Sequence, residues 1–448
     1  MCTNKVSSTF VYYWCKEKEN IMITFNEVIG YDTIKEDLKI IVDVLKGDKD
    51  SIKQGVPLIK GLLLYGGPGV GKTMMATALI NESNRKVFIC KKDEIDSDFI
   101  RKIKNTFKEA SNNTPSIVFL DDLDKFAKND KREAEYDEYV TVQSCIDEVS
   151  DKDVFVLATA NKINYFPKSL LRVGRFDKII KIDNPNYVDT VKIIAYYLEK
   201  KEFIKDIDIE FMGKLMHGYS CAEIEQIIND TVLLANYNNS NVINIDCFIE
   251  AYMRRFHDIT NNTNKYLYNK NDIEIKNRNL IAYHEAGHLV VYEILNPGTV
   301  LLATINGSYF SGGFVKKYEE NTVNDIKSIE SRIVGILGGK AAVELKFGIL
   351  DLGAKRDISM AENLVNESIS RLCCFGFNLY RVFSGENPDT EKIIRVELEK
   401  YYQKAKEIIF NNMEFLDKVA NALLEKQMIT SFDIEEIKSN CKINYVSI

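Results

Sequence analysis

A glycine-rich loop between a strand and a helix constrains the fold of this chain more than any other feature. The apolar run Gly61-Leu-Leu-Leu-Tyr65 leads directly into Gly66-Gly-Pro-Gly-Val-Gly-Lys-Thr73, and helical sequence follows from Met74 to Asn81. Strand, loop and helix in this order form the context that a P-loop requires. A glycine-rich turn without a ligand is the alternative, but the match extends over all eight residues.

Each part of this loop has an expected role in binding ATP and Mg²⁺. Glycines allow backbone N–H groups to converge on phosphate oxygens, and the N-terminus of the following helix adds a favourable dipole. We expect Lys72 to reach the β- and γ-phosphates and Thr73 to bind Mg²⁺. The other predicted nucleotide-binding residues of the loop are Gly66, Gly67, Pro68, Gly69, Val70 and Gly71.

Further apolar runs predict a doubly wound parallel sheet, and therefore an α/β domain. These runs lie at residues 87–90, 116–120, 154–158 and 178–182, with helical sequence between them. The run at 116–120 ends in Asp121-Asp122-Leu-Asp124, which suits a Walker B site beside the P-loop. Asp121 is predicted to help hold Mg²⁺ and Asp122 to orient or activate the attacking water. An acidic turn is the alternative.

Polar residues downstream complete the predicted ATPase site. Asn161 ends the next strand, where its amide can contact the γ-phosphate or its water. Arg172 and Arg175 lie three residues apart and are predicted to act as arginine fingers in a neighbouring subunit's site. Two solvated surface arginines are the alternative.

After residue 187 the sequence changes character. Helices only are predicted up to about residue 258, which suits a small helical lid behind the nucleotide; they lie at 190–198, 211–216, 222–235 and 246–256. An asparagine-rich polar stretch between 261 and 272 then marks a linker.

The sequence His284-Glu-Ala-Gly-His288 follows this linker, within a predicted amphipathic helix over 279–295. Residues four apart lie on the same face of a helix, so both imidazoles can bind one Zn²⁺. Glu285 follows the first ligand, where its carboxylate can reach a water on the metal and take its proton. Two histidines on an ordinary helix are the alternative, but the chain has only four histidines.

Composition narrows the class of protein. A chain of 448 residues is expected to form two or three domains, and its net charge of −7 argues against general nucleic-acid binding. The nine cysteines are scattered and are interpreted as reduced. No apolar run reaches the roughly 20 residues that span a bilayer. We therefore expect a soluble, cytoplasmic chain with no transmembrane segment, leaving open a membrane association through partners or a missing anchor.

A P-loop joined to a downstream His-Glu-x-x-His helix resembles the FtsH family of AAA+ zinc metalloproteases. The resemblance extends from about Ile23 to the C-terminus. Besides the P-loop, the matches are Leu170-Leu-Arg-Val-Gly-Arg-Phe-Asp177, Gly218-Tyr-Ser-Cys-Ala222, Ala282-Tyr-His-Glu-Ala-Gly-His288, Gly338-Gly-Lys-Ala-Ala342, Phe347-Gly348 and Gly353-Ala-Lys-Arg-Asp357.

The resemblance implies properties that the residues alone do not give. It implies that Asp357 is the third zinc ligand, whereas the sequence alone leaves open an N-cap role for a helix starting near Ile358. It also implies a homo-hexameric ring in which ATP hydrolysis pulls protein substrates through a pore into a proteolytic chamber. Residues 312–315 would form an edge strand with which extended substrate pairs.

The chain departs from the family at three points. The N-terminal transmembrane segments of the family are absent from this sequence. Asp122 replaces a glutamate, which should position the catalytic water poorly. The pore-loop equivalent at 91–100 lacks glycine, and Phe99 is its only aromatic residue for gripping substrate.

These observations predict five segments and leave three functional hypotheses. The segments are a tail at 1–22, a large AAA+ subdomain at 23–186, a lid at 187–260, a linker at 261–277 and a mainly α-helical zinc metallopeptidase domain at 278–448. Within the last segment, helices are predicted over 326–337, 360–372 and 389–424. The leading hypothesis is an ATP-dependent zinc endopeptidase that degrades proteins. The alternatives are a zinc peptidase whose weak ATPase ring serves assembly or regulation, and a non-enzymatic nucleotide-dependent scaffold.

Overall fold

The structure is a computed structural model that describes residues 23–47, 59–92, 98–126, 137–257, 272–307, 312–318, 325–349, 353–374 and 388–446. The chain divides into two compact units, which are described separately below. One lies within Met1–Lys205 and Met216–Leu233, and the other within Asp206–Leu215 and Leu234–Ile448. The predicted lid at 187–260 is shared between these units, and its boundaries stay a prediction.

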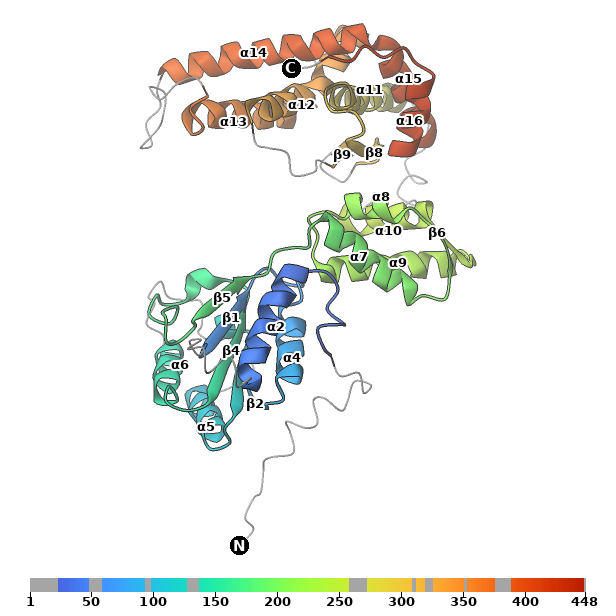
Figure 1. Ribbon diagram of the computed structural model, residues 1–448. Coiled ribbons are helices and arrows are strands. Elements are labelled where there is room, and N and C mark those ends of the chain that lie inside the picture. The colour runs from blue at the N-terminus through green and yellow to red at the C-terminus, as the bar shows by residue number, and fades with distance from the viewer. Residues whose placement is uncertain are drawn as a thin grey trace. The chain divides into compact units, whose positions relative to one another are not determined.

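The first unit is built on a five-stranded parallel sheet (Figure 1). Its strands have the order β2-β3-β4-β1-β5. Their bounds are β1 (Gly61–Tyr65), β2 (Lys86–Lys91), β3 (Ser116–Asp121), β4 (Val154–Ala160) and β5 (Lys178–Lys181). All five predicted strands are present, and the predicted parallel α/β architecture is confirmed.

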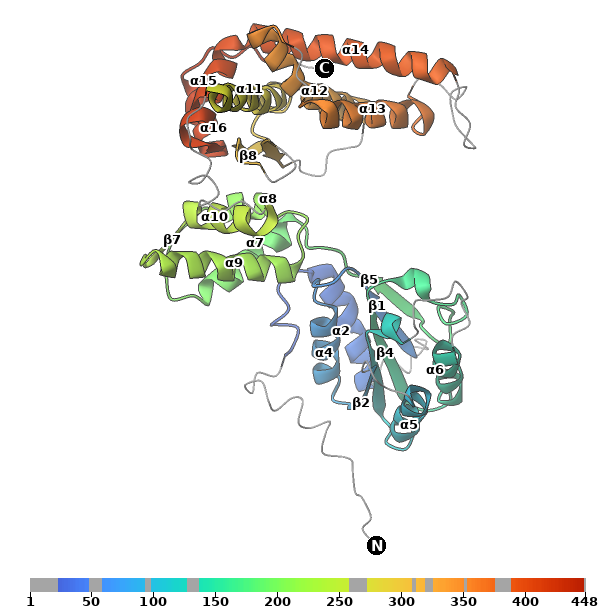
Figure 2. The ribbon, with the colours of Figure 1, turned by 180° about the vertical axis from the view of Figure 1, so that it is seen from behind.

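Helices cover both faces of this sheet, as Figures 1 and 2 show. On one face, α2 (Asp32–Lys46) and α4 (Lys72–Ser83) pack on Leu62 and Leu64. On the other face, α5 (Phe99–Ser111) and α6 (Asp137–Glu148) pack around Leu63. Successive side chains of a strand point to opposite faces, so an all-apolar strand such as β1 requires a helix layer on each side. The glycine-rich loop joins β1 to α4 at the carboxyl ends of the strands.

The region after residue 187 contains α7 (Tyr187–Glu199), α8 (Ile209–Leu215), α9 (Cys221–Tyr237) and α10 (Ile245–His257). All four predicted helices are present. The prediction of helices only is nevertheless wrong, because two short strands also occur, β6 (Ile204–Asp206) and β7 (Val242–Asn244). Strands of three residues are too short to display the alternating pattern from which a strand is predicted.

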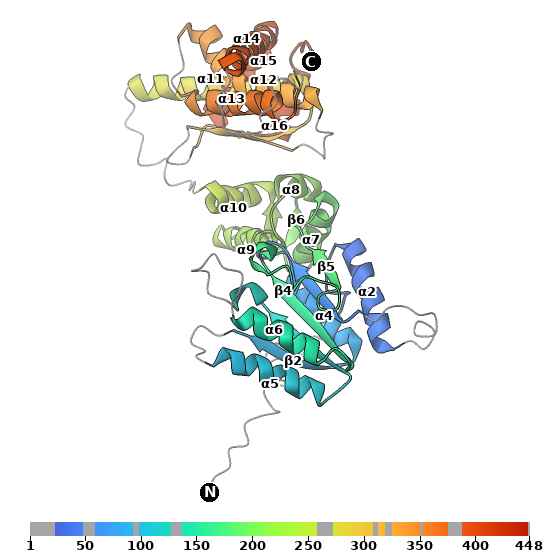
Figure 3. The ribbon, with the colours of Figure 1, turned by 90° about the vertical axis from the view of Figure 1, so that its left-hand side faces the viewer.

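From residue 272 on, the second unit is mainly helical, with a small antiparallel sheet (Figure 3). The helices of this part are α11 (Asp272–Leu295), α12 (Ile326–Phe347), α13 (Lys355–Ser370), α14 (Pro388–Asn411), α15 (Met413–Lys426) and α16 (Ser431–Ser439). The sheet has the order β10-β8-β9, with β8 (Val300–Thr304) between β9 (Phe314–Lys317) and β10 (Met428–Thr430). In the described sheet β9 is an edge strand, as predicted.

Several helix boundaries differ from the sequence expectation. Helix α12 continues beyond the predicted end at Leu337, and α11 begins at Asp272, inside the predicted linker. The helix predicted over 389–424 is interrupted at Asn412, which separates α14 from α15. In the described part of the chain no helix is long and apolar enough to cross a membrane.

Glycines allow α11 and α12 to approach each other very closely. A Cβ atom on Gly287 would lie 2.4 Å from the carbonyl oxygen of Gly338, and one on Gly338 would lie 2.6 Å from that of Gly287. A Cβ on Gly335 would overlap the ring of Tyr292, at 2.0 Å. Since contacts this short are forbidden, only glycine permits this crossing, and the crossing brings the two predicted zinc-binding histidines against α12.

Candidate metal and nucleotide sites

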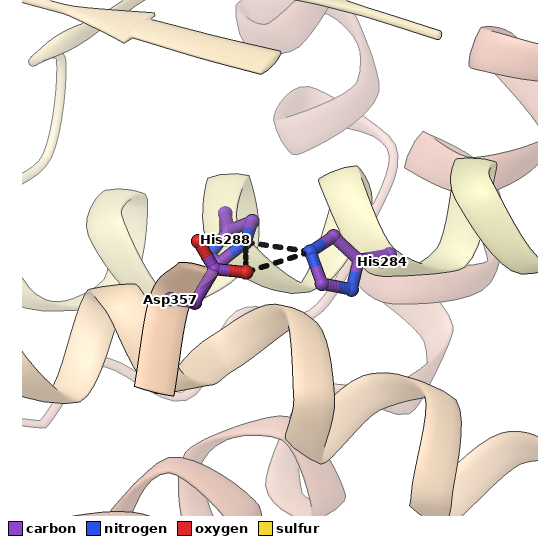
Figure 4. Close-up of side chains that lie close together, drawn as sticks. All are labelled: His284, His288 and Asp357. Atoms are coloured by element: carbon purple, nitrogen blue, oxygen red, sulfur yellow. Dashed lines mark hydrogen bonds and ion pairs between the residues drawn. The ribbon is translucent and has the colours of Figure 1, made fainter. Parts of the chain in front are cut away.

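The second unit brings the three predicted zinc ligands together (Figure 4). The Nε2 atoms of His284 and His288 on α11 lie 3.1 Å apart. The Oδ2 atom of Asp357, from the first turn of α13, lies 3.1 Å from His284 Nε2 and 3.5 Å from His288 Nε2. The N-cap alternative for Asp357 is wrong, because α13 begins at Lys355 and its N-cap is Ala354.

The donor set and its spacing fit zinc. Zn²⁺ binds imidazole nitrogen and carboxylate oxygen at about 2.0–2.2 Å in tetrahedral geometry, so its ligand atoms lie roughly 3.3 Å from one another. The observed separations of 3.1 to 3.5 Å match that value. His288 Nδ1 lies 2.9 Å from the carbonyl oxygen of Gly335, to which it can only donate. That hydrogen bond fixes the tautomer and leaves Nε2 free to bind the metal.

The surroundings of the triad keep Asp357 ionised and the ligand atoms accessible. Burial raises the pKa of Asp357, but the two imidazoles beside its carboxylate outweigh this effect and hold the pKa well below the usual range. Asp357 is therefore a carboxylate at neutral pH. A Cβ on Gly339 would lie 2.6 Å from His288 Nε2 and 2.8 Å from His284 Nε2, so a glycine there leaves room for the ligand atoms.

Glu285 lies in the same cleft and beside the edge strand. Its side chain is buried, with an exposed fraction of 6%. A Cβ on Gly313, which directly precedes β9, would lie 2.8 Å from Glu285 Oε1. The cleft has a volume of about 580 Å³ and holds the triad and Glu285 between apolar side chains, namely Leu280, Ile281, Phe314, Val315, Ile336 and Met360. An extended chain paired with β9 would therefore pass the triad.

The first unit gathers the predicted ATP-binding residues at the end of β1. Lys72 Nζ donates to the carbonyl oxygens of Gly66 and Gly67, at 2.9 and 2.7 Å, and to Asn161 Oδ1 at 2.9 Å. Burial lowers the pKa of Lys72, while the carboxylates of Asp122, Asp124 and Asp121 act in the opposite direction. The loop backbone bends through left-handed conformations at Gly69 and Gly71, which explains glycine there.

Asp121 lies at the centre of a small polar cluster. Thr159 Oγ1 donates to Asp121 Oδ1 at 2.8 Å, and Thr73 Oγ1 lies 3.5 Å from the same oxygen. Lys91, at the end of β2, forms an ion pair of 2.8 Å with Asp121 Oδ2. Thr73 and Asp121, the two residues predicted to bind Mg²⁺, are thus adjacent, and a lysine of the same chain contacts the carboxylate.

Asp122 follows β3 in a left-handed conformation, with φ 55°. Its Oδ2 atom forms an ion pair of 2.8 Å with Lys125 Nζ, and this pair raises the pKa of Lys125. The neighbouring Asp124 accepts a hydrogen bond from the backbone N–H of Asn161 at 3.1 Å and so fixes the end of β4. All predicted carboxylates of the site therefore already have partners within this chain.

The two predicted arginine fingers differ in their surroundings. Arg172 is exposed, and its side chain forms no hydrogen bond or ion pair with the described residues. Arg175 forms a bidentate pair with Asp147 on α6, at 3.1 and 2.8 Å, and also donates to Gln143 and the carbonyl oxygen of Ser169. Arg172 is the more accessible of the two, whereas Arg175 is engaged within its own chain.

Phe99, named from the sequence as the only aromatic residue available for gripping substrate, is not accessible for that role. Residues 93–97 of the predicted pore stretch lie outside the described residues, but Phe99 is described and is only 4% exposed. Its ring packs edge-on against Phe126, with centroids 4.7 Å apart. Phe99 lies on the same face of α5 as Ile103 and Phe107, which places it in the core.

Four further residues shape the two sites and were not singled out from the sequence. Lys91 and Thr159 hold Asp121, Gly335 accepts from His288, and Arg356 lines the cleft. The contacts of the first three depend on strand register and helix crossing, which no local motif encodes. One feature of the sequence could have indicated Arg356, because it directly precedes Asp357, which the resemblance had identified as a ligand.

The comparisons with known proteins agree with this geometry. The family model described as "ATPase family associated with various cellular activities (AAA)" matches residues 62–184, and that of "Peptidase family M41" matches residues 271–380. An ATP-dependent zinc metalloprotease FtsH 2 of Petrotoga mobilis is 30% identical, over 93% of this chain and 72% of its own length. The chain belongs to the FtsH family. An ATP-dependent zinc metalloprotease FtsH 2 of Thermoanaerobacter sp. is 29% identical, over 93% of this chain and 82% of its own length. An ATP-dependent zinc metalloprotease FtsH of Thermotoga maritima is 28% identical, over 95% of this chain and 74% of its own length.

Membership of the FtsH family confirms the resemblance on which the site residues were chosen. It makes the chain a hydrolase with ATPase and protease activity, so the scaffold hypothesis is set aside.

Proposed function

We propose that this member of the FtsH family is an ATP-dependent zinc endopeptidase that degrades proteins. The observation that carries the proposal is the triad of His284, His288 and Asp357, whose ligand atoms have the spacing of a tetrahedral zinc site. The triad lies beside a buried carboxylate, Glu285, and an edge strand, β9. We further propose that the chain acts as a homo-hexamer whose ATPase domains supply polypeptide to this cleft.

Each residue has a distinct part in the proposed reaction. His284, His288 and Asp357 would hold the metal, which would supply Lewis acidity and lower the pKa of the attacking water to about 7. Glu285 takes the proton of the attacking water and passes it to the leaving amine as general base and then general acid. Strand β9 offers its free edge to an extended substrate, which aligns the scissile bond through backbone hydrogen bonds.

In the ATPase domain, Gly66, Gly67, Pro68, Gly69, Val70 and Gly71 are proposed to surround the phosphates with backbone N–H groups. Lys72 would contact the β- and γ-phosphates, and Thr73 and Asp121 would hold Mg²⁺. Asp122 and Asn161 would orient the attacking water. Arg172 and Arg175 would act in a neighbour's site, for which Arg175 must first release Asp147.

A second candidate, a zinc peptidase with a weakly active ATPase ring, is favoured by one observation. Lys91 and Lys125 form ion pairs with Asp121 and Asp122, the two carboxylates on which hydrolysis is proposed to depend. In that case ATP would serve assembly or regulation more than unfolding.

Degradation of casein, an unfolded substrate, tests the main proposal. The purified chain is assayed with ATP, with ADP, and with ATP plus a zinc chelator, and its zinc content is measured in parallel. Cleavage should require both ATP and zinc, and zinc added after chelation should restore it. Cleavage that survives complete metal removal would refute the zinc mechanism. ATP-independent cleavage of casein, together with failure to degrade a stably folded protein in ATP, would favour the second candidate.

A further inference from the structure

Among the described residues that line the cleft, Arg356 carries the one guanidinium or ammonium group. The other charged or ionisable residues of this lining are His284, Glu285, His288, Asp357 and Tyr292. Arg356 is exposed, and its side chain forms no hydrogen bond or ion pair with the described residues. Although its neighbour in sequence is Asp357, that carboxylate contacts the two histidines instead.

The charges of the cleft make this guanidinium significant. If the proposed zinc ion is present, its two positive charges balance the carboxylates of Glu285 and Asp357, so Arg356 gives the cleft a net positive charge. A free guanidinium presents a planar fork of donors that matches a carboxylate.

We propose that Arg356 determines cleavage specificity by binding an acidic side chain of the substrate next to the scissile bond. The inference rests on the proposed peptidase function, since it assigns a preference to the same cleft. Arg356 is fixed close to the ligand set because it lies in the first turn of α13, one residue before Asp357. We therefore expect the substrate residue that it selects to lie close to the bond that is cut.

Lys355 provides a matched control. It carries the same charge, precedes Arg356 in the same helical turn and is exposed, but it does not line the cleft. A general effect of charge on substrate attraction would be altered equally by Lys355→Ala and Arg356→Ala. A specific contact in the cleft would be altered only by Arg356→Ala.

The first measurement is binding to the zinc-loaded full-length chain. Three peptide hydroxamates, amidated at their C-termini, differ only in Glu, Gln or Lys beside the zinc-binding group, and titration calorimetry gives their affinities. We expect Glu to bind about fivefold more tightly than Gln, the range of a partly exposed ion pair, and Lys to bind most weakly. Arg356→Ala should abolish this ranking, Arg356→Glu should reverse it, and Lys355→Ala should preserve it.

The second measurement identifies cleavage sites in a mixed peptide library by mass spectrometry. Wild type should show enrichment of Asp and Glu at one position, lost in Arg356→Ala. Two results would overturn the inference. One is that the wild type binds the Glu, Gln and Lys hydroxamates with equal affinity, and the other is that Arg356→Glu keeps the wild-type ranking at equal zinc content. Absence of any cleavage would refute the peptidase proposal instead, while the binding measurement would still decide the role of Arg356.

Discussion

At the scale of single residues, Asp122 determines how fast this chain is expected to hydrolyse ATP. Its carboxylate is one methylene shorter than the glutamate of the family, so its oxygens lie about 1 Å short of the expected position, a displacement that can cost up to about a hundredfold in rate. Its Oδ2 atom also contacts Lys125 at 2.8 Å. Both features place the carboxylate of Asp122, the proposed water-orienting group, unfavourably, although the P-loop sequence itself is complete.

The first prediction is that Asp122→Glu raises the rate of ATP hydrolysis by roughly tenfold, within the range expected for a displaced catalytic group. The side chain of Asp122 is partly exposed, at 22%, which leaves space for a further methylene. Affinity for ATP should stay unchanged because it depends on residues 66–73. Steady-state ATPase assays with a nucleotide-binding titration test this, and Asp122→Asn serves as the inactive control. A lower rate in Asp122→Glu at unchanged affinity would contradict the role given to Asp122.

The second prediction concerns Lys91, which forms an ion pair with the carboxylate of Asp121, a proposed Mg²⁺ ligand. Lys91→Ala removes this competing cation, so the Mg²⁺ concentration for half-maximal ATPase activity should fall severalfold, in line with a partly exposed ion pair. Lys92→Ala is the control, since Lys92 contacts Glu138 and not Asp121. An unchanged Mg²⁺ dependence in Lys91→Ala would show that the ion pair has no influence on metal binding.

At the scale of secondary-structure elements, the crossing of α11 and α12 shapes the proposed zinc site. Helix α11 carries two of the proposed ligands and Glu285, while α12 supplies the carbonyl oxygen that accepts the hydrogen bond of His288. Because Gly287 and Gly338 meet backbone to backbone, a side chain at either position must push the helices apart. The geometry of the triad therefore depends on residues that bind nothing themselves.

The third prediction is that Gly338→Ala destabilises the second unit by about 1–3 kcal/mol, the usual cost of overpacking a core. The added methyl would lie 2.6 Å from the carbonyl oxygen of Gly287, and the resulting shift should also weaken zinc binding. Thermal unfolding and zinc analysis measure the two effects. Lys327→Ala, on an exposed part of the same helix, should change neither. Normal stability and zinc content in Gly338→Ala would contradict the close crossing.

The elements also show what could be predicted from sequence. Local patterns predict the glycine-rich loop, the five strands of the parallel sheet and the spacing of His284 and His288, and the structure contains all of them. Lys91 and Asp121 become neighbours only through the pairing of β2 with β3, where they lie directly opposite each other. Such a register is a property of the assembled sheet and not of either segment. The burial of Phe99 could not be predicted for a similar reason, because it depends on packing against Phe126.

At the scale of the whole molecule, the proposed arginine fingers require subunits to complete one another's nucleotide sites. The side chain of Arg172 is exposed and has no partner among the described residues, as expected for a group that acts on a neighbouring subunit. Arg175 is held by Asp147 in the same chain. Of the two, Arg172 is the residue that we expect to contribute most directly to a neighbour's nucleotide.

The fourth prediction is that ATPase activity requires a hexamer and that Arg172→Ala lowers it by about 10³-fold or more, the usual effect of losing an arginine finger. Light scattering gives the oligomeric state with ATP. Mixing Arg172→Ala with Lys72→Ala subunits should restore part of the activity, because each supplies what the other lacks. A strictly monomeric species with full ATPase activity would refute the proposed fingers.

The most direct test of the peptidase assignment compares casein degradation by the wild type and by Glu285→Gln at equal zinc content. Glu285 is not among the three ligands, so Glu285→Gln should retain about one Zn²⁺ per chain, as expected for a single three-ligand site. Removal of a general base should lower kcat by about 10²–10⁴-fold. We predict full zinc occupancy together with loss of casein cleavage. A variant that keeps a tenth of the wild-type rate would show that another group takes the proton and would contradict the account.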